Sequence, residues 1–356
     1  EVVRDKIPLN SIDAAFMLDK NVGYIKLDRF AQTSNTEFEE SLAKLKTQKM
    51  KSLILDLRGN TGGYLNIAAE LSNQFLKKDM TIVYTEGDKS PKQILKKKKN
   101  GKFTDGKLII LIDEGSASAS EIVSGAVQDW DRGILIGRRS FGKGLVQRPF
   151  NLPDGSQVRL TTARYYTPTG RCIQRSYEKG SEDYYNEMTK RMKHGEFYHS
   201  DSIQFPDSLK YSTLLSERTV YGGGGIMPDI FVSSDTADMT SYAQDALSRG
   251  LISRFALKYS DTNRQTLAKY KTYETLTKYL ASQPVVEEFV IFAKDRGLKP
   301  RYNLIKKSRK VISRALYSNI TYQVLGMLEH VKYINESDST VLKAIEVLEK
   351  GEATIE

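Results

Sequence analysis

Short apolar runs that alternate with helical segments are the feature that most constrains the fold of this chain. Residues 51–59 (KSLILDLRG), 107–113 (KLIILID) and 133–137 (GILIG) are almost continuously apolar. The segments between them, at 64–78 and 116–130, have the composition of helices. Strands that are buried on both faces and joined through helices form parallel sheets. The pattern, with an earlier strand at 21–30 and helix at 34–49, therefore predicts an α/β core with a largely parallel sheet.

The sequence changes character near residue 237. Residues 237–356 hold only two prolines, Pro284 and Pro300, and many segments with apolar residues at helical spacing, which predicts an α-helical C-terminal region. The core is then expected at residues 22–236. Within it, the polar and aromatic stretch 176–221 is predicted to be an insertion with a short helix, and Pro153-Asp154-Gly155 is predicted to turn a β-hairpin.

Charge and cysteine content exclude some classes and leave others open. The net charge of +10 comes from 54 basic residues distributed along the chain beside 44 acidic ones, with one dense basic run at residues 95–102. Because that run contains the turn-forming pair Asn100-Gly101, a solvated hairpin tip is favoured over a nucleic-acid patch. The single Cys172 excludes an internal disulfide framework and a CxxC metal site. No apolar run approaches the roughly 18 residues that span a bilayer.

Residues 137–145 (GRRSFGKGL) come within one residue of a phosphate-binding loop. That motif requires Ser or Thr directly after the lysine, because the hydroxyl ligates magnesium, whereas Gly144 follows Lys143 here. A helix should also follow, but the next residues alternate like a β-hairpin. A nucleotide site is therefore disfavoured, and Lys143 becomes a candidate for chemistry of its own.

Two strand ends carry residues suited to catalysis. After the strand at 107–113, Ser118 and Glu121 stand at capping-box spacing, so a helix should begin there and present unpaired N–H groups that suit an oxyanion. From this motif alone, capping by Ser116, Ser118 and Ser120 is the favoured reading. The turn at 59–63 (GNTGG) lets the backbone approach a ligand closely, although taken alone it is a tight turn.

A serine nucleophile requires a base. The three histidines, His194, His199 and His330, lie in the insertion and the helical tail, so a Ser-His-Asp triad would need one of them to reach the core. A metal site at 194–199 (HGEFYH) lacks a convincing third ligand. Lysine serves as a base when burial depresses its pKa, and Lys143 is the candidate.

Several ordered motifs between Val22 and Val232 closely resemble the C-terminal processing peptidases, also called tail-specific proteases. Two of the motifs are SASASEIVSGAVQD and GRRSFGKGLVQ, and 25 positions separate Ser118 of the first from Lys143 of the second. The others are VGYIKLDRF, LILDLRGNTGG, TTARYYTPTGRCIQ and GGGGIMPDIFV. The resemblance implies a crotonase/ClpP-like ββα core. Because family members usually carry a PDZ domain before that core, residues 1–21 are expected to be a linker strand that follows such a domain.

The resemblance also implies the roles of individual residues. Ser118 is the nucleophile, Lys143 the general base, and Gln147 orients the lysine amine. The oxyanion hole is built from the N–H groups of Ala119 and Gly63, with Gly62 as the nearby alternative. Ser140 stands where the family more often has threonine. The remaining motif residues are supporting or structural, namely Ser116, Ser120, Asp56, Arg58 and Asn60.

The function implied by the resemblance is that of a serine endopeptidase with a Ser-Lys dyad that forms an acyl-enzyme. It implies no metal and no organic cofactor, and its partners are protein or peptide substrates with apolar C-termini, with no nucleic acid and no nucleotide. A periplasmic or membrane-associated extracytoplasmic location and a homo-oligomer through the helical parts are further expectations. The alternative is a non-catalytic peptide-binding scaffold on the same fold.

Overall fold

The computed structural model describes residues 5, 9–96, 101–177 and 180–351. These residues divide into two compact units, one that extends through Ser234 and resumes at Lys343, and one that covers Asp235–Leu342. The helical unit thus begins close to the predicted boundary at residue 237, while the end of the chain from Lys343 is grouped with the first unit. Among the described residues, no helix is long and apolar enough to cross a membrane.

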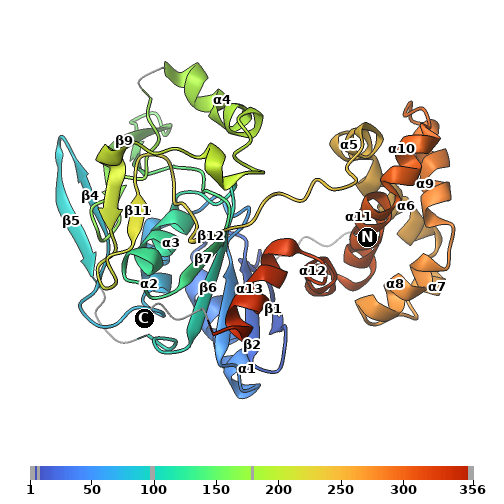
Figure 1. The fold of residues 1–356 in the computed structure, drawn as a ribbon, viewed down its shortest axis with the longest axis horizontal. Helices are drawn as coiled ribbons and strands as arrows, with labels where there is room; N and C mark the ends of the chain where they lie inside the picture. Colours follow the sequence, from blue (N-terminus) through green and yellow to red (C-terminus); the bar gives the residue numbers. More distant parts are fainter. Residues whose placement is uncertain (1–4, 6–8, 97–100, 178–179, 352–356) are drawn as a thin grey trace. The chain divides into compact units, whose positions relative to one another are not determined.

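A six-stranded sheet forms the centre of the first unit (Figure 1). Its order is β1 (Ile12–Met17), β2 (Val22–Leu27), β3 (Ser52–Asp56), β6 (Lys107–Ile112), β7 (Ile134–Gly137) and β12 (Ile230–Phe231). The pair β1–β2 is antiparallel and every other neighbouring pair is parallel. All five residues of β3 are buried, as a strand covered on both faces requires. The expected α/β class with a largely parallel sheet is therefore confirmed.

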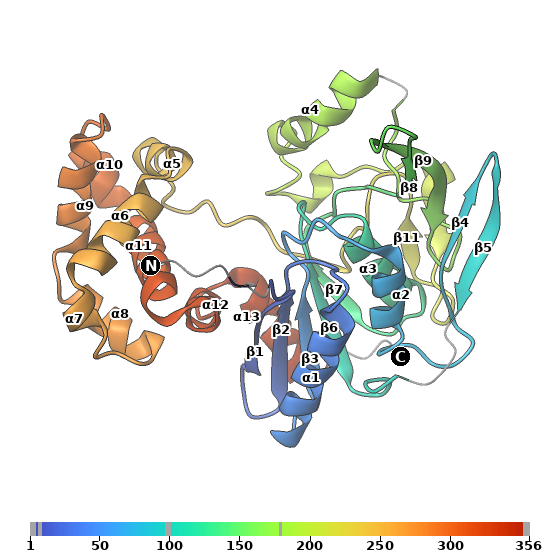
Figure 2. The ribbon, with the colours of Figure 1, turned by 180° about the vertical axis from the view of Figure 1, so that it is seen from behind.

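Three helices cover this sheet: α1 (Ser34–Thr47), α2 (Leu65–Ser72) and α3 (Ala119–Asp129), with α2 and α3 packed side by side (Figure 2). Their apolar faces join the strands in one core; α1 contributes Phe38, Leu42 and Leu45 at helical spacing. The helix predicted at 64–78 ends early, at Ser72. The carbonyl groups of Gln74 and Phe75 instead accept hydrogen bonds from the Phe103 N–H and the Arg132 side chain.

A second, antiparallel sheet has the order β5 (Ser90–Lys96), β4 (Thr81–Gly87), β9 (Gln157–Tyr166) and β8 (Leu145–Asn151). The predicted hairpin is β8–β9, and its turn at Pro153-Asp154-Gly155 lies where it was expected. The predicted hairpin tip at 95–102 falls largely on residues 97–100, outside the described residues. The stretch 176–221 holds α4 (Gly180–Lys193), two short 3-10 helices (Ser200–Ser202 and Asp207–Leu209), and the small hairpin β10 (Lys210–Ser212) and β11 (Thr219–Tyr221).

All secondary structure among the described residues of the second unit is helical, as the sequence predicted. This unit has its own core, in which the ring of Phe255 packs edge-on against Phe289 and Phe292, with ring centres 5.6 and 5.4 Å apart. The helices of the C-terminal region are α5 (Ser241–Ser248), α6 (Leu251–Thr262), α7 (Arg264–Leu267), α8 (Tyr273–Ala281), α9 (Val285–Lys294), α10 (Tyr302–Lys307), α11 (Arg309–Leu325), α12 (Met327–Asn335) and α13 (Ser339–Glu349).

Candidate active site

Three loops meet at one edge of the parallel sheet because the strands before them end in register. Asp56 of β3 lies opposite Leu111 of β6, and Leu111 lies opposite Ile136 of β7. The carboxyl ends of neighbouring parallel strands are where α/β folds place their reactive groups. The segments that follow these strands, residues 57–64, 113–118 and 138–144, are those in which the sequence placed its candidate site residues.

Ser118 has the strained backbone that functional residues often adopt. It stands directly before α3 with φ 56° and ψ −111°, outside the regions that a residue with a side chain prefers. Such a conformation costs about 1–3 kcal/mol and persists only where the surroundings enforce it. Gly62 supplies part of that enforcement, because a Cβ there would lie 2.8 Å from both the Ala117 carbonyl oxygen and the Ser118 Cβ.

Glu121 ties the serine segment to the lysine segment. Its side chain is fully buried, and Oε2 accepts hydrogen bonds from the N–H groups of Ser118 and Lys143 at 2.8 and 2.9 Å. Oε1 accepts from the Ser140 hydroxyl at 2.5 Å and from the Gly142 N–H at 2.7 Å. Burial raises the pKa of Glu121, and these four hydrogen bonds offset part of that rise. One carboxylate therefore fixes both backbones.

Tyr165 makes a second connection between the same two segments. Its hydroxyl lies 2.9 Å from the Ser118 carbonyl oxygen and also contacts the carbonyl oxygen of Lys143. Burial, followed by the nearby charge of Glu121, raises the pKa of Tyr165 well above its usual value. The phenol therefore stays neutral and keeps its proton for donation to these carbonyl groups.

Ser118, Lys143 and Gln147 line one cleft with a volume of about 640 Å³, together with Gly63, Tyr64, Ile122 and Tyr165. Ser118 and Lys143 are half-buried, and Gln147 is exposed. Although the cleft brings these side chains together, no hydrogen bond among the described residues joins the Ser118 hydroxyl to the Lys143 amine. The structure thus holds the two backbones in place and leaves the two reactive side chains unlinked.

The N–H groups of Ala119 and Gly63 have no acceptor among the described residues. Gly62 differs, because its N–H donates to Asn60 Oδ1 at 2.9 Å. Gly63 has φ 151°, and a Cβ there would lie 2.2 Å from the Phe30 carbonyl oxygen, so only glycine fits. Of the two glycines, Gly63 is therefore the one with a donor left for a ligand.

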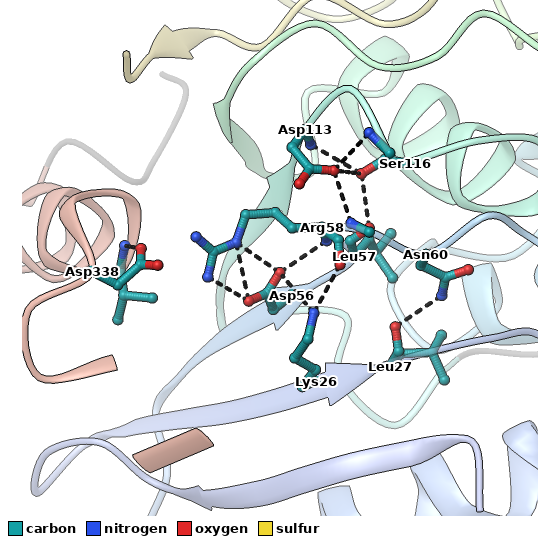
Figure 3. A network of polar contacts seen from close by, with 12 residues as sticks. Lys26, Leu27, Asp56, Leu57, Arg58, Asn60, Asp113, Ser116 and Asp338 are labelled. Atoms are coloured by element: carbon teal, nitrogen blue, oxygen red, sulfur yellow. Dashed lines mark hydrogen bonds and ion pairs between the residues drawn. The ribbon is translucent and has the colours of Figure 1, made fainter. Parts of the chain in front are cut away.

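The turn that carries Gly63 is anchored by buried polar side chains (Figure 3). Asp56 pairs with Arg58 at 2.6 Å and with Lys26 at 3.7 Å. Burial would raise the pKa of Asp56, but the charges of Arg58 and Lys26 outweigh it and hold the pKa well below its usual range. The Ser116 hydroxyl donates to the Leu57 carbonyl oxygen at 2.8 Å.

Asn60 completes the anchor of this turn. Its side chain donates to the Leu27 carbonyl oxygen, while its own carbonyl oxygen accepts from the Ala117 N–H and the Ser120 hydroxyl. These contacts make Asp56, Asn60, Ser116 and Ser120 framework residues, which agrees with the supporting roles expected for them.

The insertion packs against the lysine loop through buried charges. Arg191 of α4 donates to the carbonyl oxygens of Ser140 and Arg139 at 2.9 and 2.8 Å and pairs with Glu196 at 2.7 Å. Arg139 pairs with the same Glu196 at 2.7 Å. The guanidinium of Arg175 lies 4.0 Å from the centre of the Phe141 ring, one residue from Gly142. The insertion therefore adds a third support to the segment that presents Lys143.

The alternative sites of the sequence do not converge on this cleft. None of the three histidines lines it: His194 and His199 are exposed, and Nδ1 of His330 lies 2.9 Å from the Ser318 carbonyl oxygen in the helical unit. Lys143 is followed by strand β8 rather than by a helix, which removes the geometry of a phosphate-binding loop. Within the described residues, no group of three His, Cys, Asp or Glu side chains is placed to hold a metal ion.

Sequence reasoning found Glu121 only as a capping partner and missed Tyr165 and Arg191. The capping-box spacing was the one available signal for Glu121, since its contacts to Gly142 and Lys143 cross more than 20 positions. Tyr165 is one of two adjacent tyrosines, and only the pairing of β9 decides which of them faces the site. Arg191 lies in a polar insertion that carries no motif.

Residues 21–181 match peptidase family S41, and residues 242–326 match DUF8443, a family of unknown function. The chain is 41% identical over 179 residues to a carboxy-terminal-processing protease of Bartonella bacilliformis, which covers 49% of this chain and 41% of that protein. It is 36% identical over 172 residues to the carboxy-terminal processing protease CtpA of Bacillus subtilis, which covers 48% of this chain and 36% of that protein.

Among solved structures, a photosystem II D1 C-terminal processing protease matches with a TM-score of 0.46 and 24% identity, over 66% of this chain and 51% of that one. The chain spans less than half the length of the two curated relatives described above. The segment that matches family S41 carries both Ser118 and Lys143. Residues 21–181 of the chain thus form a peptidase family S41 domain, and the chain is similar to carboxy-terminal-processing proteases over about half of its length.

Proposed function

We propose that this chain is the catalytic part of a serine endopeptidase in which Ser118 is the nucleophile and Lys143 is the general base. The observation that carries the proposal is the cleft that brings Ser118 and Lys143 together beside two N–H groups without acceptors. Those donors, on Ala119 and Gly63, are of the kind that stabilises the oxyanion of a tetrahedral intermediate.

The reaction runs in two stages. Ser118 Oγ attacks the peptide carbonyl carbon while the neutral Lys143 amine takes the hydroxyl proton, and the carbonyl oxygen becomes an oxyanion between the two N–H donors. Collapse of the intermediate breaks the C–N bond, and the lysine ammonium gives its proton to the leaving amine. Water, activated by the same amine, then attacks the ester carbon, and release of the acid restores the Ser118 hydroxyl.

We expect assembly of the dyad to come from motion of the Lys143 side chain. The Lys143 backbone is held at its N–H by Glu121 and at its carbonyl by Tyr165, whereas its four-carbon side chain has several rotatable bonds. Gln147 lines the same cleft and orients the amine once substrate has entered. Catalytic hydrogen bonds often tighten only when substrate binds, so the unlinked side chains fit a resting enzyme.

Relatives named for carboxy-terminal processing support a polypeptide substrate for this chain. Selection of apolar C-termini, an extracytoplasmic location and assembly through the helical unit belong to the same proposal. The unlinked dyad favours one alternative, a peptide-binding scaffold that does not cleave.

Casein hydrolysis tests the proposal. The parent chain should cleave at neutral and alkaline pH, and Ser118→Ala and Lys143→Ala should each lose about 10³-fold or more in rate, as loss of a nucleophile or base does in other serine proteases. Ser248→Ala and Lys299→Ala, at exposed positions of the helical region, serve as matched controls and should keep the parent rate. A serine-directed fluorophosphonate should label the parent but not Ser118→Ala; absence of labelling in the folded parent would favour the scaffold.

A further inference from the structure

The cleft that holds Ser118 and Lys143 is lined by two cations and by no carboxylate. Among its described lining residues, the charged side chains are Lys143 and Arg159. The reaction proposed above needs Lys143 in its neutral form, so Arg159 supplies the permanent charge of the cleft. No carboxylate among the described residues forms an ion pair with Arg159. A polypeptide that binds in the cleft can therefore supply the carboxylate that pairs with Arg159.

The pairing of β9 with β8 explains why Arg159 faces the cleft. A register shift between Val146 and Gln147 interrupts the alternation of side chains, so the buried face of Tyr165 and Ala163 does not continue along the hairpin. Beyond the shift, Pro149 pairs with Arg159, and paired residues lie on the same face of a sheet. Arg159 therefore shares a face with Pro149 and Gln147, and all three line the cleft.

The opposite face of the hairpin has a different character. Val158 and Leu160 alternate with Arg159 and are exposed, at 37% and 52% of their surfaces. Phe150 of β8 pairs with Val158, and Arg148 pairs with Leu160, so all four share the face that points away from the cleft. Arg148 is also exposed and does not line the cleft. Arg148 and Arg159 therefore lie on opposite faces of the hairpin, at neighbouring positions.

We infer that Arg159 binds a carboxylate of the substrate polypeptide and so makes this cleft selective for chains with a negative charge near the cleavage site. The inference rests on the proposed function and deepens it. Arginine presents a planar set of N–H donors that match a carboxylate in a bidentate manner. Arg159 and Tyr165 are six positions apart on a strand that rises about 3.3 Å per residue and contains one register shift, so an extended substrate places the carboxylate several residues from the scissile bond.

The carboxylate has two sources, an acidic side chain or the C-terminal carboxyl group, and peptides distinguish them. The substrates are internally quenched peptides that share one neutral core. One series scans a single Asp through positions on both sides of the cleaved bond, and a second ends as free acid or as amide at increasing distance from it. Each is assayed with the parent, Arg159→Gln and the matched control Arg148→Gln, which removes the same charge from the opposite face.

The parent and Arg148→Gln should cleave the best carboxylate-bearing peptide about tenfold more efficiently than its neutral counterpart, in kcat/KM. In Arg159→Gln this ratio should fall to about one. A preference for Asp identifies a side chain as the source, and a preference for acid over amide identifies the chain terminus. Equal cleavage of charged and neutral peptides by the parent, or an equal loss of preference in both variants, overturns the inference.

Binding separates failure of the inference from failure of the proposed function. Fluorescence anisotropy with Ser118→Ala, alone and combined with either arginine variant, measures affinity for the same peptides without cleavage. If no peptide is cleaved by the parent but the carboxylate preference in binding depends on Arg159, the peptidase proposal fails and the inference stands. If peptides are cleaved and neither rate nor affinity depends on the carboxylate, the inference fails and the peptidase proposal stands.

Discussion

The structure behind Ser118 and Lys143 differs sharply from the cleft in front of them. Behind, the carboxylate of Glu121, the phenol of Tyr165 and the guanidinium of Arg191 bind backbone N–H and carbonyl groups of the two segments that carry Ser118 and Lys143. In front, no hydrogen bond within the described part of the chain links the side chains of Ser118 and Lys143, and the N–H groups of Ala119 and Gly63 have no acceptor there. The protein thus fixes the backbone that presents the reactive groups and leaves those groups available, which is how a site is preorganised for a substrate.

This comparison predicts that damage to the framework should reduce turnover more than substrate binding, with effects that follow the number and burial of the contacts removed.

Glu121→Gln should lower kcat by about 100-fold, because misplacement of a catalytic group by about 1 Å has that effect. The carboxylate accepts four hydrogen bonds, two at each oxygen. The amide replaces one oxygen with an NH₂ group, which repels two of these donors, so Ser118 and Lys143 move apart. Peptide hydrolysis checks the loss, with Glu86→Gln at an exposed site as control. Full activity in a folded Glu121→Gln would mean that this carboxylate is only a helix cap.

Asp56→Asn should lower the free energy of unfolding by about 3 kcal/mol at neutral pH, because it removes the buried charge that Arg58 and Lys26 pair with. The pKa of Asp56 is lowered by folding, so its stabilisation is fully present above the unfolded pKa of about 4 and is lost as pH falls below that value toward the folded pKa. Denaturant unfolding from pH 7 to pH 3 should show the deficit shrinking on the acid side.

The matched control for this variant is Asp88→Asn, at an exposed position of the β4–β5 turn, which should show little deficit at any pH. A deficit for Asp56→Asn that stays constant down to pH 3 would contradict the assignment of a lowered pKa to Asp56. It would then reflect lost packing rather than lost charge.

Arg191→Lys should lower kcat by about tenfold with little change in KM. A lysine ammonium cannot span the two carbonyl oxygens of Arg139 and Ser140 and the Glu196 carboxylate that the guanidinium contacts at once. Poor folding would also lower the apparent kcat at constant KM, so kcat is calculated per folded molecule, with the folded fraction measured by thermal unfolding. Arg249→Lys, on the surface of the helical unit, is the control. Unchanged kcat would make the insertion dispensable for the lysine loop.

Tyr165→Phe should have the smallest effect, a loss of about fivefold in kcat/KM, since it removes one neutral hydroxyl worth about 1 kcal/mol. The core keeps an aromatic ring of the same shape. Tyr166→Phe is a close control, because the neighbouring side chain lies on the other face of β9 and stacks on Tyr84 instead. Equal effects of the two substitutions would show that the hydroxyl of Tyr165 does not support the site.

The framework and the cleft were predictable from the sequence to different degrees. The apolar runs and the glycine-rich turn predicted the parallel sheet and the loops at its carboxyl edge, and the ordered motifs pointed to the family. The pairing of Ser118 with Glu121 was visible because the two residues are three positions apart. The contact between Glu121 and Lys143 was not, because residues 22 positions apart meet only after β7 has joined the sheet.

Local patterns in the sequence were enough to predict the parallel strands β2, β3, β6 and β7, most of the helices, the hairpin at residues 153–155 and the chemical types of the site residues. Only the tertiary structure decided what depends on pairing across the chain. Strand register selects Tyr165 over Tyr166 for the core and Arg159 over Arg148 for the cleft, because successive side chains point to opposite faces. Packing also leaves the N–H of Gly63 rather than that of Gly62 without an acceptor, since Asn60 already occupies the latter.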